Sequence, residues 1–171
     1  MAKKTDKNKP VNTKTVPGRR ALRFNSIADL AVEIDRIVAA DAAGRLGRVG
    51  NWSAGRIFGH LAKWIEMSYS GFPFKVSGFM RFIGTTFMKR RMLTKGFPAG
   101  VSLPKSALAA IGDYPDMPAA DGALRLKKAL ARLKAGEIPS HPSPLLGPLS
   151  LDEWTQLHLR HAELHLSFLH P

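Results

Sequence analysis

The sequence contains no cysteine among its 171 residues. Without thiols the chain forms no disulfide, offers a metal no thiolate ligand and has no cysteine nucleophile, so any metal must be held by nitrogen or oxygen atoms. Long apolar runs are missing as well. None approaches the roughly 20 residues that span a bilayer, and no apolar segment follows the N-terminal lysines as it would in a secretory signal. We therefore expect a cytoplasmic protein without a membrane partner.

Acidic residues are scarce: 26 lysines and arginines face 13 aspartates and glutamates, which leaves a net charge of +13. Part of this excess lies in residues 1–20, which hold seven basic side chains and one acidic one. That segment has no aromatic side chain for base stacking and no groove-reading motif, so we expect a solvated, disordered tail without a specific nucleic-acid partner. Residues 21–171 are long enough for a single domain with a substantial core.

Strand-like alternation is absent, and four segments instead show the apolar periodicity of helices. Ser26 with Asp29, and Ser150 with Glu153, form the spacing of a capping box at two of the starts, and Ser53 is suited to cap a third. The sequence therefore predicts an all-α four-helix bundle with one long crossover between its second and third helices. The expected helices span residues 26–43, 53–70, 119–135 and 150–169.

The crossover contains a segment, residues 79–95, whose apolar positions scatter around the helical wheel. Its buried face cannot be assigned from the pattern, and its basic cluster near residue 90 suits a lid, a dimer surface or a patch lying on a membrane. We favour a packed helical insertion. The connection over residues 97–117 is expected to be irregular because it contains several prolines.

The last predicted helix carries three histidines along its apolar stripe. An inward-facing imidazole needs a partner, which for a single histidine is usually a carbonyl or a carboxylate. His161 and His165, however, lie four residues apart on one face, which lets two ring nitrogens converge on one ion. The centre of the stripe holds Trp154, His158, His161, His165 and Phe168, and the face expected to meet solvent holds Asp152, Gln156, Arg160, Glu163 and Ser167.

His60 is the candidate third ligand, because it lies on or beside the apolar stripe of the second predicted helix with Ile57, Leu61 and Trp64. Facing helices of a bundle commonly build metal sites in the core, so His60 could meet His161 there. Taken alone, a histidine in this position is more often a core residue.

Two stretches resemble the DinB-like (YfiT-like) superfamily of helical bundle proteins. They are NWSAGRIFGHLAKWIEMSYSGFP at residues 51–73 and GPLSLDEWTQLHLRHAELHLSFL at residues 147–169. The lead-in HPSPLLGPLSLDEW is similar to that of an uncharacterised bacterial branch of the superfamily, and the resemblance covers roughly residues 20–170.

This resemblance implies that His60, His161 and His165 bind one divalent metal. It also implies chemistry on a small molecule, since known relatives include transferases and isomerases that use low-molecular-weight thiols such as bacillithiol or mycothiol. Related bundles often pair, so a homodimer is expected. His158 is a feature added to the family's pattern.

Three neutral imidazoles leave open positions on Zn²⁺, Ni²⁺ or Fe²⁺, and the ion brings the pKa of a bound water toward about 7 or binds a thiol as thiolate. The sequence HAELH is not a zinc-protease motif, and Glu163 falls on the opposite face. We predict His158 as a catalytic proton shuttle or substrate contact, with a core role as its alternative. His141 could reach the mouth of the site or lie on the surface.

The sequence thus favours a metal-dependent transferase or hydrolase that acts on a small molecule. One alternative is a non-enzymatic metal-binding or scaffold protein whose basic tail contacts polyanions. Another is a pocket in which the histidines hold no metal.

Overall fold

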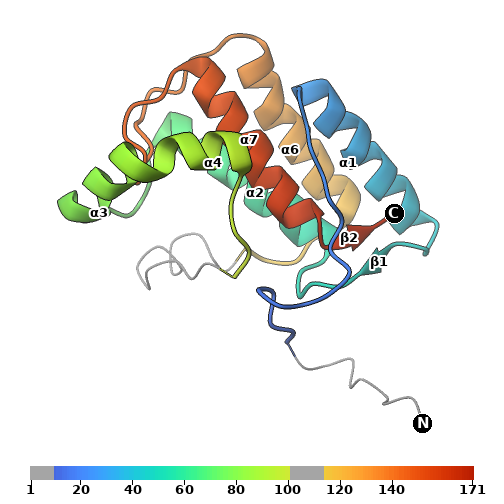
Figure 1. Ribbon diagram of the computed structural model, residues 1–171. Helices are drawn as coiled ribbons and strands as arrows, with labels where there is room; N and C mark the ends of the chain where they lie inside the picture. The colour runs from blue at the N-terminus through green and yellow to red at the C-terminus, as the bar shows by residue number, and fades with distance from the viewer. Residues whose placement is uncertain (1–9, 101–113) are drawn as a thin grey trace.

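The computed structural model describes residues 10–100 and 114–171, and this part of the chain is predominantly helical, as predicted (Figure 1). Its four long helices are α1 (Ile27–Ala42), α2 (Ala54–Ser70), α6 (Ala119–Lys134) and α7 (Leu151–Leu166). The capping boxes predicted at Ser26 and Ser150 are both present, and the Ser53 side chain accepts from a backbone amide at the start of α2. Within the described ranges, no helix is long and apolar enough to cross a membrane.

The four long helices share one large hydrophobic core, and a small second cluster surrounds Met67. Helices α2 and α6 approach each other most closely because glycines lie at their contact: a Cβ added at Gly122 would come within 2.7 Å of the Gly55 carbonyl oxygen. This contact fixes the position of α2, and so of the histidine that α2 carries. The largest fully buried side chains are Trp154, Phe58, Leu30, Ile34, Ile37, Ile57, Ile65, Leu126, Leu146, Leu166 and Leu169.

The crossover between α2 and α6 forms a bent helical arm. It consists of α3 (Gly78–Ile83), the π-helical turn η1 (Gly84–Met88) and α4 (Lys89–Lys95). The expected helical insertion is therefore present. Helix α4 buries Met92 and Leu93 and packs on α7, and η1 is buried at Gly84, which lies against Leu145, whereas α3 buries no residue. Figure 1 shows α3 extending away from α1 and α6. The predicted irregular connection falls partly in residues 101–113, outside the described residues.

The C-terminal helix ends earlier than predicted. Helix α7 stops at Leu166. Strand β2 (Leu169–His170) pairs antiparallel with strand β1 (Gly47–Arg48), which lies between the first two predicted helices. The apolar spacing continues through Phe168, so the pattern could not reveal the end of the helix. Strands of two residues are too short to show alternation.

Residues 10–20, assigned above to a disordered tail, lie against the helices. Val11 donates its backbone amide to the Asn51 side chain at 2.8 Å, and the Arg19 guanidinium donates to Ser167 Oγ at 2.9 Å. Arg20 forms an ion pair with Glu33 at 2.5 Å. The prediction for residues 1–9 lies outside the described residues.

The polar face of α7 meets solvent only in its first half. Asp152 and Gln156 are exposed, as expected, whereas Arg160 and Ser167 are buried and Glu163 is half-buried. Arg160 is only 3% exposed, donates to the Phe24 carbonyl and pairs with Glu163 at 2.9 Å. Glu163 in turn accepts the Phe24 amide at 2.6 Å. The chain ahead of α1 therefore covers the second half of this face, and Arg160 and Glu163 satisfy its backbone groups instead of facing water.

Candidate metal centre

The structure brings together the three histidines predicted as ligands. His60 projects from α2, and His161 and His165 project from adjacent turns of α7. The Nε2 atom of His161 lies 3.4 Å from His60 Nε2 and 3.0 Å from His165 Nε2. One ligand atom from each residue falls within 4.8 Å of the other two, so the group could hold a metal ion.

The spacing of these nitrogens fits metal coordination. Zinc–nitrogen bonds of about 2.0–2.1 Å place two ligand atoms about 3.3 Å apart at a tetrahedral angle and about 3.0 Å apart at a right angle. The observed separations of 3.4 Å and 3.0 Å are close to these two values. The hydrophobic core sets the packing of α2 and α7. This packing holds the ring nitrogens at distances that one ion can bridge.

His161 Nε2 also lies close to more ring nitrogens than it can hydrogen-bond. A neutral imidazole nitrogen carries either one proton or one lone pair, so it makes one good hydrogen bond. His161 Nε2 nevertheless has two other Nε2 atoms within 3.4 Å. A cation shared by three lone pairs satisfies all three nitrogens at once, whereas hydrogen bonding among them does not.

Burial keeps the imidazoles of His161 and His165 neutral. Burial lowers the pKa of His161 well below the ordinary 6.5, and the neighbouring His165 and His60 lower it further. Burial, followed by the charge of Arg19, lowers the pKa of His165 to about 4. Neutral imidazoles are the form that binds metal, so at neutral pH the ion does not have to displace protons from these two ligands.

Aromatic side chains enclose the three imidazoles. Trp52 stacks on His165 with ring centroids 5.3 Å apart, and Trp64 and Phe97 contact the His161 ring at 5.4 Å and 5.5 Å. These rings restrict the rotation of the imidazoles and keep the surroundings apolar. Trp52 and Phe97 lie outside the helices, so no periodicity in the sequence indicates that they reach the site.

His158 lies apart from the three-histidine group. Its ring stacks on Trp154 with centroids 5.4 Å apart, and burial lowers its pKa to about 3. Within the described part of the chain, its Nε2 atom is buried and has no hydrogen-bond partner. His158 is therefore a buried, neutral histidine that precedes His161 on the same helix.

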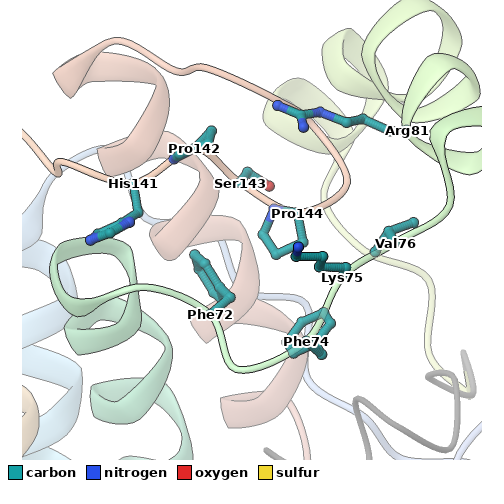
Figure 2. Close-up of a pocket in the computed structure, with 9 residues that line it drawn as sticks. All are labelled: Phe72, Phe74, Lys75, Val76, Arg81, His141, Pro142, Ser143 and Pro144. Carbon is teal, nitrogen blue, oxygen red and sulfur yellow. The ribbon is translucent and has the colours of Figure 1, made fainter.

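His141 is exposed and lies in the proline-rich loop before α7, where its backbone amide donates to the Ser68 carbonyl at 3.0 Å. It belongs to a cavity of about 400 Å³ that none of the three clustered histidines lines. Figure 2 shows Arg81 entering from α3 and Lys75 from the segment before it, with Phe72 and Phe74 nearby. The cavity is lined by Phe72, Phe74, Lys75, Val76, Arg81, His141, Pro142, Ser143 and Pro144.

A smaller cavity, of about 200 Å³, is not lined by the clustered histidines either, but two of its lining residues act on them. Its lining includes Phe97, which contacts the His161 ring, and Arg19, whose charge acts on His165. Arg20 and Lys95 add two further cationic side chains to its wall. Arg160 and Glu163, which pair with each other, also line this cavity, so the wall beside Phe97 has a net positive charge.

Comparison with known proteins shows the family of the chain. The family described as "Protein of unknown function (DUF1569)" matches residues 17–171, which include all three clustered histidines. No curated protein matches the sequence, and no solved structure matches it. The chain belongs to the DUF1569 family.

Proposed function

We propose that the protein is a metal-dependent enzyme in which His60, His161 and His165 hold one divalent ion, Zn²⁺, Ni²⁺ or Fe²⁺. The observation that carries this proposal is the placement of His161 Nε2 within 3.4 Å of two other imidazole nitrogens. We further propose that α1, α2, α6 and α7 form a four-helix bundle of the DinB-like type. In such bundles, side chains on facing helices commonly supply the metal ligands.

The chemistry follows from the number and charge of the ligands. Three neutral imidazoles leave at least one position open, and a bound ion supplies water of lowered pKa or a thiolate as the nucleophile. The group itself contains no carboxylate, so the ligands do not offset the charge of the ion. An anionic group on the visiting molecule is therefore favoured, by the ion and by Arg19 beside His165.

The substrate that fits this arrangement is a small anionic molecule, with a low-molecular-weight thiol as the first candidate. The cavity beside Phe97 holds about 200 Å³, which suits a small molecule and excludes a folded protein. Its cationic wall would bind a carboxylate of such a molecule. The reaction would then be thiol transfer, or hydrolysis if water is the nucleophile.

His158 keeps its predicted role in proton transfer as part of the proposal. Because burial lowers its pKa to about 3, the ring stays neutral at neutral pH. Its Nε2, which has no hydrogen-bond partner in the described part of the chain, would exchange a proton with a substrate or water molecule that reaches it. Its stacking on Trp154 fixes the direction in which the ring nitrogens point.

The test begins with metal content. Untagged protein is stripped with a chelator, refilled with Zn²⁺, Ni²⁺ or Fe²⁺, desalted and analysed for metal, beside the variants His161→Ala and His141→Ala. We expect one ion per chain in the wild type and in His141→Ala, and loss of the ion in His161→Ala with unchanged helix content. Wild-type protein that retains no ion would contradict the proposed site.

The loaded protein is then assayed for conjugation of small thiols to electrophiles and for hydrolysis of small esters and amides. Turnover by the wild type and by His141→Ala, but not by His161→Ala, supports an enzyme. Bound metal without turnover in either assay would favour the alternative, a non-enzymatic metal-binding protein.

A further inference from the structure

The helical arm exposes an unusual concentration of large apolar side chains. Phe79, Phe82 and Phe87 are 72%, 59% and 68% exposed, and Met80 is 44% exposed. Exposed apolar residues scattered singly are normal on protein surfaces, whereas a contiguous group marks an interaction site. All four lie within nine residues on α3 and η1, the part of the arm that extends away from α1 and α6 in Figure 1.

The π-helical turn gathers two of these rings into one surface. In a regular α-helix, residues five apart point about 140° away from each other. In η1 the Lys89 amide bonds to the Gly84 carbonyl, five residues back, and this wider turn brings Phe87 beside Phe82. Their ring centroids are 6.4 Å apart in an edge-to-face contact. Single π-turns are rare and occur frequently at functional sites.

The same part of the chain is strongly basic. No acidic residue occurs between Glu66 and Asp113, whereas this stretch contains seven lysines and arginines. Lys89 pairs with Glu153 at 2.8 Å, but the described residues provide no ion-pair partner for the exposed Arg81, Arg90 and Arg91. The arm therefore combines exposed phenylalanines with unneutralised positive charge.

We propose that the arm docks on an anionic lipid surface. The phenylalanines would enter the boundary between headgroups and acyl chains, and the arginines would bind lipid phosphates, as in helices that lie on membranes. This proposal revises the expectation that the protein has no membrane partner. It does not depend on the proposed metal chemistry.

Two other occupants fit the arm less well. A second copy of the chain would bring arms of the same charge together. A nucleic acid needs separate ring faces on which bases stack. Phe82 and Phe87 instead pack edge to face on each other.

The test measures co-sedimentation of the full chain with vesicles of phosphatidylcholine alone, or with about 30% phosphatidylglycerol added. The variant F79S/F82S/F87S removes the rings. Its matched control is V32S/L124S/I138S, which changes three apolar side chains that are also more than half exposed but lie away from the arm. The variant R90Q/R91Q removes two charges of the arm, and K128Q/K134Q removes two exposed charges of α6.

We expect binding to the anionic vesicles only. At about a fivefold effect for each basic residue near the surface, R90Q/R91Q should weaken binding by about thirtyfold. F79S/F82S/F87S should weaken it at least tenfold, and both control variants should bind as the wild type does. Circular dichroism checks that each variant is folded.

Three results would overturn the proposal. The first is no binding of the folded wild type to either vesicle, and the second is equal loss of binding in the arm variants and their controls. The third is a wild type that does not bind vesicles but forms a dimer or binds single-stranded RNA through the same phenylalanines. That result would assign the arm to another partner.

Discussion

Replacing His158 with leucine should make the protein more resistant to acid. His158 is buried, and burial lowers its pKa from about 6.5 to about 3. Between these values the unfolded chain binds a proton at this position that the folded chain does not. Unfolding therefore takes up a proton, and the free energy of unfolding falls as the pH falls below about 6.5.

The size of the effect follows from the two pKa values. At about 1.4 kcal/mol for each pKa unit, His158 lowers the free energy of unfolding by about 2 kcal/mol at pH 5 and by about 5 kcal/mol once the pH is below 3. Leucine has no proton to bind and a similar volume, so this part of the pH dependence should disappear in His158→Leu. His161, whose pKa is influenced by His158, still titrates in the variant.

The assay is urea unfolding followed by circular dichroism at pH 7.5 and pH 5, with a chelator present so that metal does not contribute. From pH 7.5 to pH 5, the wild type should lose about 2 kcal/mol more than His158→Leu. His141→Leu, which replaces an exposed histidine, should lose as much as the wild type. Equal losses in the wild type and in His158→Leu would refute the idea that a buried neutral imidazole resists protonation at this position.

Two further predictions concern the packing that positions the site. Glu163→Ala should lower the free energy of unfolding by about 3 kcal/mol, because it leaves the buried Arg160 without its ion pair, whereas Glu137→Ala, in an exposed pair, should have far less effect on the urea midpoint. Gly122→Ala should cost about 2 kcal/mol because the new methyl group meets a carbonyl of α2 at 2.7 Å, while Gly78→Ala, with nothing within 4 Å, should stabilise the arm by about 0.5 kcal/mol. If Glu137→Ala lowered the free energy of unfolding as much as Glu163→Ala, the role of the buried ion pair would be contradicted. If Gly122→Ala left that free energy unchanged, the close contact between α2 and α6 would be contradicted.

The helices and their starts could be predicted because the sequence marks them locally. Ser26 and Ser150 each begin a capping box whose two hydrogen bonds form within four residues. The histidines could be predicted for a similar reason, since the spacing of His161 and His165 on one helix decides that they share a face. The prediction of His60 as the third ligand required a further assumption, namely that two helices distant in the sequence face each other.

The features that were missed depend on contacts between distant parts of the chain. Arg160 looked like a surface residue because its helical face is polar, and only the segment around Phe24 buries it. Trp52 and Phe97 reach the imidazoles from loops, where no periodicity indicates direction. The π-turn at Gly84–Met88 has no sequence signature of its own. A helical wheel drawn for a regular α-helix therefore placed on different faces the phenylalanines that the π-turn brings together.

X-ray absorption spectroscopy of the zinc-loaded protein tests the central claim most directly, because it counts the ligand atoms around the ion and identifies imidazole rings. We predict three imidazole nitrogens at about 2.0–2.1 Å from zinc, with an oxygen ligand from solvent or a sulfur ligand from an added thiol completing the shell. His60→Ala should reduce the count to two or abolish binding. A wild-type spectrum with one imidazole or none would contradict the account.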